Sequence, residues 1–235
     1  MCLIEGERSV TSALVAGAEL EFVVYTPAFD GTDVIEEAIK SAVSLVIVDD
    51  REMQNLSDVR TPQGILAVAR SPLVTELSLQ SSGSILILDG IQDPGNAGTL
   101  IRTAAWFGIE AVLAADGTVD ILSPKVIRST MGGMWDIKIG RTHSISDWMN
   151  GWKSKGGFVV AGDMNGINVS DWIPSPRTAL VIGGEANGLS REMKTHLDVG
   201  VLIGRPADSG DVIGVESLNA AVAGGILMSH WATTR

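Results

Sequence analysis

The stretch SILILDGIQDPGNAG, residues 84–98, decides the fold class of this chain. Its first part, Ser84 to Asp89, is an unbroken apolar run of the kind found in strands of parallel sheets that are covered on both faces. The loop that follows contains several glycines, and a helix is expected from Thr99 to Phe107. A buried strand that leads through a loop into a helix predicts an α/β unit. The loop lies where open α/β sheets bind ligands, at the carboxyl end of a strand.

The same alternation continues to the end of the chain. Apolar runs predict four further strands, and helical periodicity or capping predicts two further helices. The strands are expected at 111–114, 158–161, 179–182 and 199–203, and the helices near 189–195 and 217–231. Strands that alternate with helices predict one parallel sheet, so residues 84–235 are interpreted as one α/β domain.

The part before this domain has its own α/β pattern. Residues 1–72 are predicted to form a small domain, with helices and strands in turn, and residues 73–83 a linker. The helices are expected at 10–18 and 33–41, and the strands at 22–25, 44–48 and 65–69.

The composition is that of a globular protein, with 45% hydrophobic and 19% charged residues among 235. The single cysteine, Cys2, excludes an internal disulfide and favours a reducing, cytoplasmic location. His143, His196 and His230 lack the spacing of metal ligands, so no metal site is expected. No segment approaches the roughly 20 apolar residues of a membrane helix, and no signal peptide is recognised.

A net charge of −11 is unusual for a protein that binds nucleic acid, because phosphate recognition relies on cationic side chains. An RNA-binding function therefore requires a local basic surface. The candidate cations are Arg102, Lys125, Arg128, Arg141, Arg177, Arg191 and Lys194.

Three separated loops carry polar residues suited to a site. The first holds Asn96, with Arg102 one turn further along the expected helix. The second places Glu185 among glycines at 183, 184 and 188. The third holds Ser217, a candidate helix cap, and Asn219. Each loop alone is equally compatible with an ordinary capped turn. The dinucleotide, P-loop and nucleophile-elbow patterns are not found.

Taken together, the three loops resemble the ordered motifs of the SpoU/TrmH family of RNA 2'-O-ribose methyltransferases in the SPOUT superfamily. The matching segments are DPGNAG (93–98) with Arg102-Thr103-Ala104, GGE (183–185) with Gly188-Leu189-Ser190, and Ser217-Leu218-Asn219; PKVIRSTMG (124–132) also resembles the family. In the first domain, Glu5-Gly6-Glu7-Arg8 and Thr61-Pro62-Gln63-Gly64-Ile65 resemble the family's ribosomal-protein-like substrate-binding domain.

The resemblance implies a trefoil-knotted catalytic domain that acts as a homodimer. It implies S-adenosyl-L-methionine as methyl donor, with S-adenosyl-L-homocysteine as product, held by backbone groups at Gly183, Gly184, Ile203 and Leu218. It implies that the motif-one arginine, Arg102, works on the ribose hydroxyl. Asn96, Glu185, Ser217 and Asn219 would fix Arg102 and the ribose. Because arginine is normally protonated, orientation or phosphate binding suits Arg102 better than a base role. No metal is implied.

One departure from the family pattern lies between Ile203 and Ser217. The family usually has a short loop here, whereas this chain has the longer stretch GRPADSGDVIGVE, residues 204–216. Asp208 and Asp211 would border the cofactor, and Val212 and Ile213 are alternatives to Ile203 for cofactor contact.

The leading hypothesis is a methyltransferase acting on rRNA, because the additional N-terminal domain favours a structured rRNA. A tRNA 2'-O-methyltransferase is the nearest alternative, and an enzyme of antibiotic resistance is compatible with the same motifs. The acidic charge also keeps open a catalytically silent RNA-binding or assembly protein. A metabolic α/β enzyme would explain the acidity but not three family motifs in order.

Overall fold

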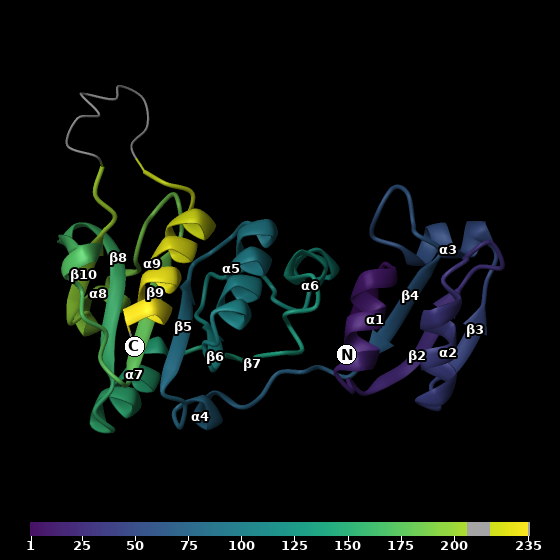
Figure 1. Ribbon diagram of the computed structural model, residues 1–235, viewed down its shortest axis with the longest axis horizontal. Coiled ribbons are helices and arrows are strands. Elements are labelled where there is room, and N and C mark those ends of the chain that lie inside the picture. The colour runs from purple at the N-terminus through teal and green to yellow at the C-terminus, as the bar shows by residue number, and fades with distance from the viewer. Residues whose placement is uncertain (206–216, 235) are drawn as a thin grey trace.

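The computed structural model describes residues 1–205 and 217–234, arranged as two domains side by side (Figure 1). The first domain is built on a four-stranded sheet in the order β1-β4-β2-β3. β4 pairs antiparallel with both β1 and β2, whereas β2 and β3 are parallel. Its elements are β1 (Cys2–Glu5), α1 (Glu7–Val15), β2 (Leu20–Tyr25), α2 (Thr32–Lys40), β3 (Ser44–Ile47), α3 (Asp50–Leu56) and β4 (Ile65–Ala69).

The second domain is built on a six-stranded parallel sheet in the order β10-β8-β9-β5-β6-β7. The strands are β5 (Ser84–Asp89), β6 (Ala111–Ala114), β7 (Lys138–Arg141), β8 (Phe158–Asn168), β9 (Thr178–Gly183) and β10 (Val199–Leu202). The helices are α4 (Glu76–Leu79), α5 (Pro94–Trp106), α6 (Pro124–Thr130), α7 (Ile145–Ser154), the 3-10 turn η1 (Val169–Asp171), α8 (Arg191–His196) and α9 (Ala220–Thr234).

The unbroken apolar character of β5 is explained by helices on both faces of the sheet. Leu86 and Leu88 pack in one core with residues of α5 and α9, such as Leu100 and Leu227. Ile85 and Ile87 point to the opposite face, where they pack with residues of α4, α7 and α8. Because successive strand residues alternate between faces, both sets must be apolar. The parallel α/β architecture predicted from residues 84–89 is confirmed.

Several boundaries differ from those expected. Residues 73–83, predicted as a linker, contain α4, and Leu73 forms a bridge with Ile139 of β7. β8 runs well beyond its expected end at Ala161, because its later residues pair with β10 across a register shift. The sequence patterns also do not predict β7, the helices α3, α6 and α7, or the short η1. No helix in the described ranges could span a membrane.

Candidate active site

The second half of the loop after β5, residues 94–98, belongs to the first turns of α5. Asp93 accepts a hydrogen bond from the backbone N–H of Asn96 at 2.8 Å, and Pro94 occupies the first helical turn. The helix expected from Thr99 therefore begins at Pro94, because an Asp cap followed by proline starts a helix. Asn96 is not the cap, so its side chain is available for other partners.

The loop after β9 is tied to the end of β5. The N–H of Gly184 donates to the carbonyl of Asp89 at 3.0 Å, and the N–H of Ser190 donates to the Asp89 carboxylate at 2.6 Å. A Cβ on Gly184 would lie 2.5 Å from the carbonyl oxygen of Gly90, so only glycine allows the two loops to approach so closely. Asp89 thus holds the first and second loops together.

The third loop ends in a capped helix, but the cap is not the residue expected. Asn219 Oδ1 accepts from the N–H groups of Ala221 and Val222 at 3.0 and 3.2 Å, so Asn219 caps α9. The prediction of Ser217 as cap is wrong, because α9 begins only at Ala220. Ser217 is exposed and lines the cavity described below.

The three loops meet in one hydrogen-bond network. Asn219 Nδ2 donates to Asn96 Oδ1 and to Glu185 Oε1, both at 3.0 Å. Asn96 Nδ2 donates to the same carboxylate oxygen of Glu185. With Asn219 Oδ1 fixed by α9, the orientation of both amides is set. In the described part of the chain Glu185 Oε2 accepts no hydrogen bond, so it is open to a ligand.

Arg102 lies on α5, six residues after Asn96, and its side chain is exposed. It forms no hydrogen bond or ion pair with any residue the structure describes. A Cβ on Gly133 would come within 3.1 Å of the Arg102 Cα, so the segment after α6 packs against the helix at this point. The guanidinium is therefore carried on a firmly packed backbone while remaining free to engage a substrate.

A cavity of about 870 Å³ opens beside the network. Its walls include all four predicted cofactor positions, Gly183, Gly184, Ile203 and Leu218, together with Glu185 and Ser217. Charged side chains at the wall are Asp163, Glu185, Lys194 and Arg205. The volume lies within the ordinary range for small-molecule sites. Asn96, Arg102 and Asn219 do not line it.

Asp163, a charged residue at the cavity wall, is not among the candidates from the sequence. It lies two residues beyond the apolar run that ends at Ala161, and its position just after that run is the signal that could have indicated it. The alternatives Val212 and Ile213, and most of the unusual loop, lie outside the described residues. No cluster of three or more His, Cys, Asp or Glu suited to a metal occurs in residues 1–205 and 217–234.

Burial raises the pKa of Asp89 above its ordinary value, although the N–H of Ser190 acts in the opposite direction. A raised pKa means that the folded state prefers the protonated group. This contribution to stability is present at low pH and is lost as pH rises through the folded pKa.

Asp89→Asn should therefore be at least as stable as the native protein at pH 7, because the amide oxygen still accepts from Ser190 without a buried charge. Urea unfolding at pH 7 and under acid conditions checks this. The difference in the free energy of unfolding between Asp89→Asn and the native protein should shrink on acidification. A variant clearly less stable at pH 7 would contradict the assignment.

Comparison with known proteins agrees with this geometry. Residues 83–229 match the SpoU rRNA Methylase family, and residues 1–67 match the MRM3-like substrate binding domain. The 23S rRNA (guanosine(2553)-2'-O)-methyltransferase RlmP of Bacillus subtilis (strain 168) is 29% identical over 97% of this chain and 87% of its own length.

Mitochondrial rRNA methyltransferase 3 of Mus musculus is 28% identical over 96% of this chain; the chain spans 66% of that relative. The crystal structure of the AdoMet-bound rRNA methyltransferase from Sinorhizobium meliloti superposes with a TM-score of 0.80 at 25% identity. That match covers 97% of this chain and 85% of the other. The family match alone spans more than half of the chain and contains all three loops of the network. This chain belongs to the SpoU rRNA methylase family.

Proposed function

We propose that this protein transfers a methyl group from S-adenosyl-L-methionine to a ribose 2'-hydroxyl of rRNA. The observation that carries the proposal is the bonding of Asn96, Glu185 and Asn219, from three separate family motifs, beside one ligand-sized cavity. A family member that had lost its activity would have no need to keep these three side chains bonded to one another.

The cavity fits the cofactor in size and in chemistry. Backbone at Gly183, Gly184, Ile203 and Leu218 would hold its base and ribose. The cavity wall carries both charge signs, with Asp163 and Glu185 suited to cationic groups of the cofactor and Lys194 and Arg205 suited to its carboxylate. The bound cofactor supplies a methyl group that its sulfonium has already activated.

The protein's own task is to orient the acceptor and accommodate its proton. Asn96 and Glu185 hold fixed positions beside the cavity, and Arg102, further along α5, carries a guanidinium that bonds to no described residue. A guanidinium can grip a phosphate with paired N–H donors, which would fix the ribose relative to the methyl donor. Orientation of this kind lowers a barrier by several kcal/mol. Ser217 lies at the cavity wall, so it would contact the ligand bound in the cavity.

The N-terminal domain favours rRNA over tRNA as substrate. Its match is to a substrate-binding domain named for an rRNA methyltransferase, and relatives that align over nearly the whole chain are named for rRNA. Such a substrate would place the protein in the cytoplasm with the ribosome.

The experiment that tests the function compares 2'-O-methylation of the host's rRNA and tRNA with and without the gene. Loss of one rRNA methyl group on deletion supports the proposal, and loss of a tRNA methyl group points to the tRNA alternative. If no position changes and the purified protein does not bind S-adenosyl-L-methionine in calorimetric titration, the protein is an RNA-binding scaffold.

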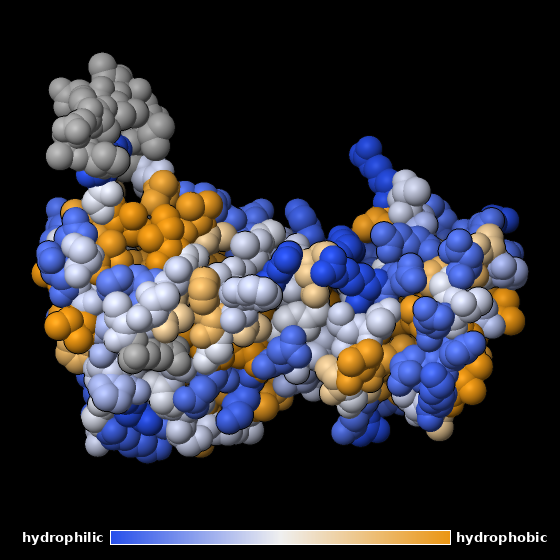
Figure 2. Space-filling view, viewed as in Figure 1, coloured by the Kyte–Doolittle hydropathy of each residue, from blue (hydrophilic) through white to orange (hydrophobic). Residues whose placement is uncertain are grey.

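We also propose that the protein acts as a homodimer through α9. This helix buries one side in the core, yet it exposes Val222 (50%) and Ile226 (38%), next to Leu218 (44%). Figure 2 shows an apolar area over the beginning of α9. A helix that is apolar on all sides is expected to be covered on all sides.

Val222→Asp combined with Ile226→Asp is expected to give a monomer in light scattering, because charges would be buried in the interface. Ile173→Asp, at a position 87% exposed on another segment, is the matched control and should leave the mass unchanged. A native protein that is already monomeric would reject the dimer.

A further inference from the structure

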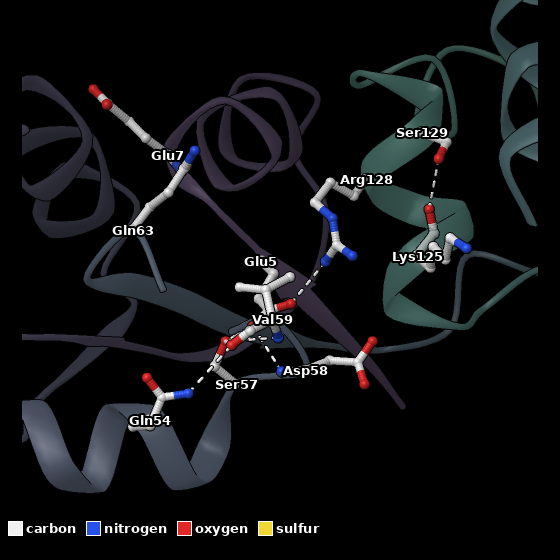
Figure 3. Close-up of polar contacts among 10 residues, drawn as sticks. All are labelled: Glu5, Glu7, Gln54, Ser57, Asp58, Val59, Gln63, Lys125, Arg128 and Ser129. Atoms are coloured by element: carbon white, nitrogen blue, oxygen red, sulfur yellow. Dashed lines mark hydrogen bonds and ion pairs between the residues drawn. The ribbon is translucent and has the colours of Figure 1, made fainter. Parts of the chain in front are cut away.

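The two domains are joined by a buried acidic side chain (Figure 3). Glu5, at the end of β1, is only 5% exposed. It accepts hydrogen bonds from the hydroxyl of Ser57 and, at 2.9 Å, from the N–H of Asp58. Its other oxygen accepts from Arg128 Nη1 of α6 at 2.7 Å. A carboxylate removed from water in this way needs a cationic partner, and that partner belongs to the catalytic domain.

The contact continues beside the ion pair. A Cβ on Gly132, just after α6, would lie 2.7 Å from the Cβ of Ser12 on α1, so the two backbones approach closely. In Figure 1, α6 lies between the body of the catalytic domain and α1. The ion pair Lys153–Asp198, by contrast, joins two segments of one domain.

The same helix packs directly on the first motif of the site. A Cβ on Gly98 would collide with Ser129 and, at 2.7 Å, with the carbonyl oxygen of Val126. Ser129 follows Arg128 in sequence, and Gly133 packs beside Arg102. A short series of rigid contacts therefore leads from Glu5 through α6 to the helix that carries Asn96 and Arg102.

We propose that Glu5 and Arg128 are a positioning pair that fixes the N-terminal domain on α6, so that RNA bound by this domain presents its ribose to Asn96 and Arg102. The inference rests on the proposed function. Neither residue needs to touch the reacting atoms. The pair acts through the angle between the domains, and a change in that angle displaces the ribose from the reacting position.

The test removes the interdomain bond from the catalytic side. Arg128→Met leaves the bonds of Glu5 to Ser57 and Asp58 intact, and Arg128→Lys retains a cation as the conservative rescue. Lys138→Met is the charge-matched control, since Lys138 is exposed on β7 and forms no ion pair within the described ranges. Single-turnover methylation of an unmodified 23S rRNA transcript is measured at saturating RNA and cofactor, together with affinity for each.

For Arg128→Met the single-turnover rate should fall about 10- to 100-fold, because misplaced reactants react slowly. Affinities for S-adenosyl-L-methionine and RNA should change little, Arg128→Lys should recover part of the rate, and Lys138→Met should match the native protein. A native rate in Arg128→Met would overturn the proposal. An equal loss of cofactor affinity would also overturn it, by showing a merely structural role. The melting temperature of Arg128→Met is expected to fall, because Glu5 loses its cation, so rates are compared at a temperature at which the variant is folded.

A second measurement does not depend on activity. Spin labels at Glu36→Cys on α2 and Ser154→Cys on α7 report the distance between the domains, and buried Cys2 should remain unlabelled. Arg128→Met should broaden the distance distribution. Ser12→Leu, which keeps both charges but adds bulk against Gly132, should shift it, whereas Ser12→Ala should not. An unchanged distribution in Arg128→Met would refute the positioning pair, even if the transcript were no substrate.

Discussion

Arg102→Ala is expected to lower the rate of methyl transfer by about 100- to 1,000-fold, the loss expected when one preorganised donor is removed from a reacting centre. The side chain is exposed and makes no bond to any described residue, so its removal leaves no cavity and no unpaired group. The melting temperature and the affinity for S-adenosyl-L-methionine should therefore remain native. The substitution should act only on the ribose acceptor, which loses the group proposed to orient it.

Single-turnover methylation and calorimetric cofactor titration check this expectation. Arg102→Lys keeps the charge but not the planar fork, so it should recover only part of the rate. Lys138→Ala removes an exposed cation on β7 that forms no ion pair with any described residue; it is the control and should behave as native. A native rate in Arg102→Ala would remove Arg102 from the site.

The second large effect on the rate is expected from substitution of Asn219, whose side chain has two separable functions. Its Oδ1 caps α9, and its Nδ2 donates to Asn96 and Glu185. Asn219→Ala removes both, so we expect a loss of about 1 kcal/mol in the free energy of unfolding. The rate should fall by up to about 100-fold, because Asn96 and Glu185 lose a shared partner.

Asn219→Asp separates these functions. Aspartate caps a helix as well as asparagine does, so the stability that comes from the cap should be retained. Its carboxylate cannot donate, and it places a like charge opposite Glu185, so the rate should fall at least as far as in Asn219→Ala. Urea unfolding and single-turnover rates provide the comparison. An active Asn219→Asp would mean that only the cap matters.

Much of the fold follows from local sequence. Ile85 and Leu86 are buried on opposite faces of the sheet, so β5 needs apolar residues at every position, and this makes it recognisable without a structure. The end of β8 could not be predicted, because Gly162 to Asn168 has no apolar period and pairs with β10 only in the folded sheet. The glycines of DPGNAG favour a loop up to Gly98, whereas α5 begins at Pro94, because Asp93 caps the helix and proline fits its first turn.

Some features of the site also follow from the sequence, whereas others depend on the folded structure. The sequence identified the three loops, because their residues resemble family motifs. It could not reveal that Asn219 rather than Ser217 caps α9, nor that Asn96 and Asn219 share one oxygen of Glu185. Asp163 was found only through the cavity. The bond between Glu5 and Arg128 joins residues 123 positions apart, and no local pattern predicts it. The knot implied by the resemblance stays a prediction.

In the most direct measurement, the purified protein is incubated with methyl-labelled S-adenosyl-L-methionine and unmodified 23S rRNA transcript. The labelled nucleoside is then identified. The account predicts a single 2'-O-methylated ribose, formed about 100- to 1,000-fold more slowly with Arg102→Ala. Label on a base, or no transfer despite bound cofactor and RNA, would contradict it.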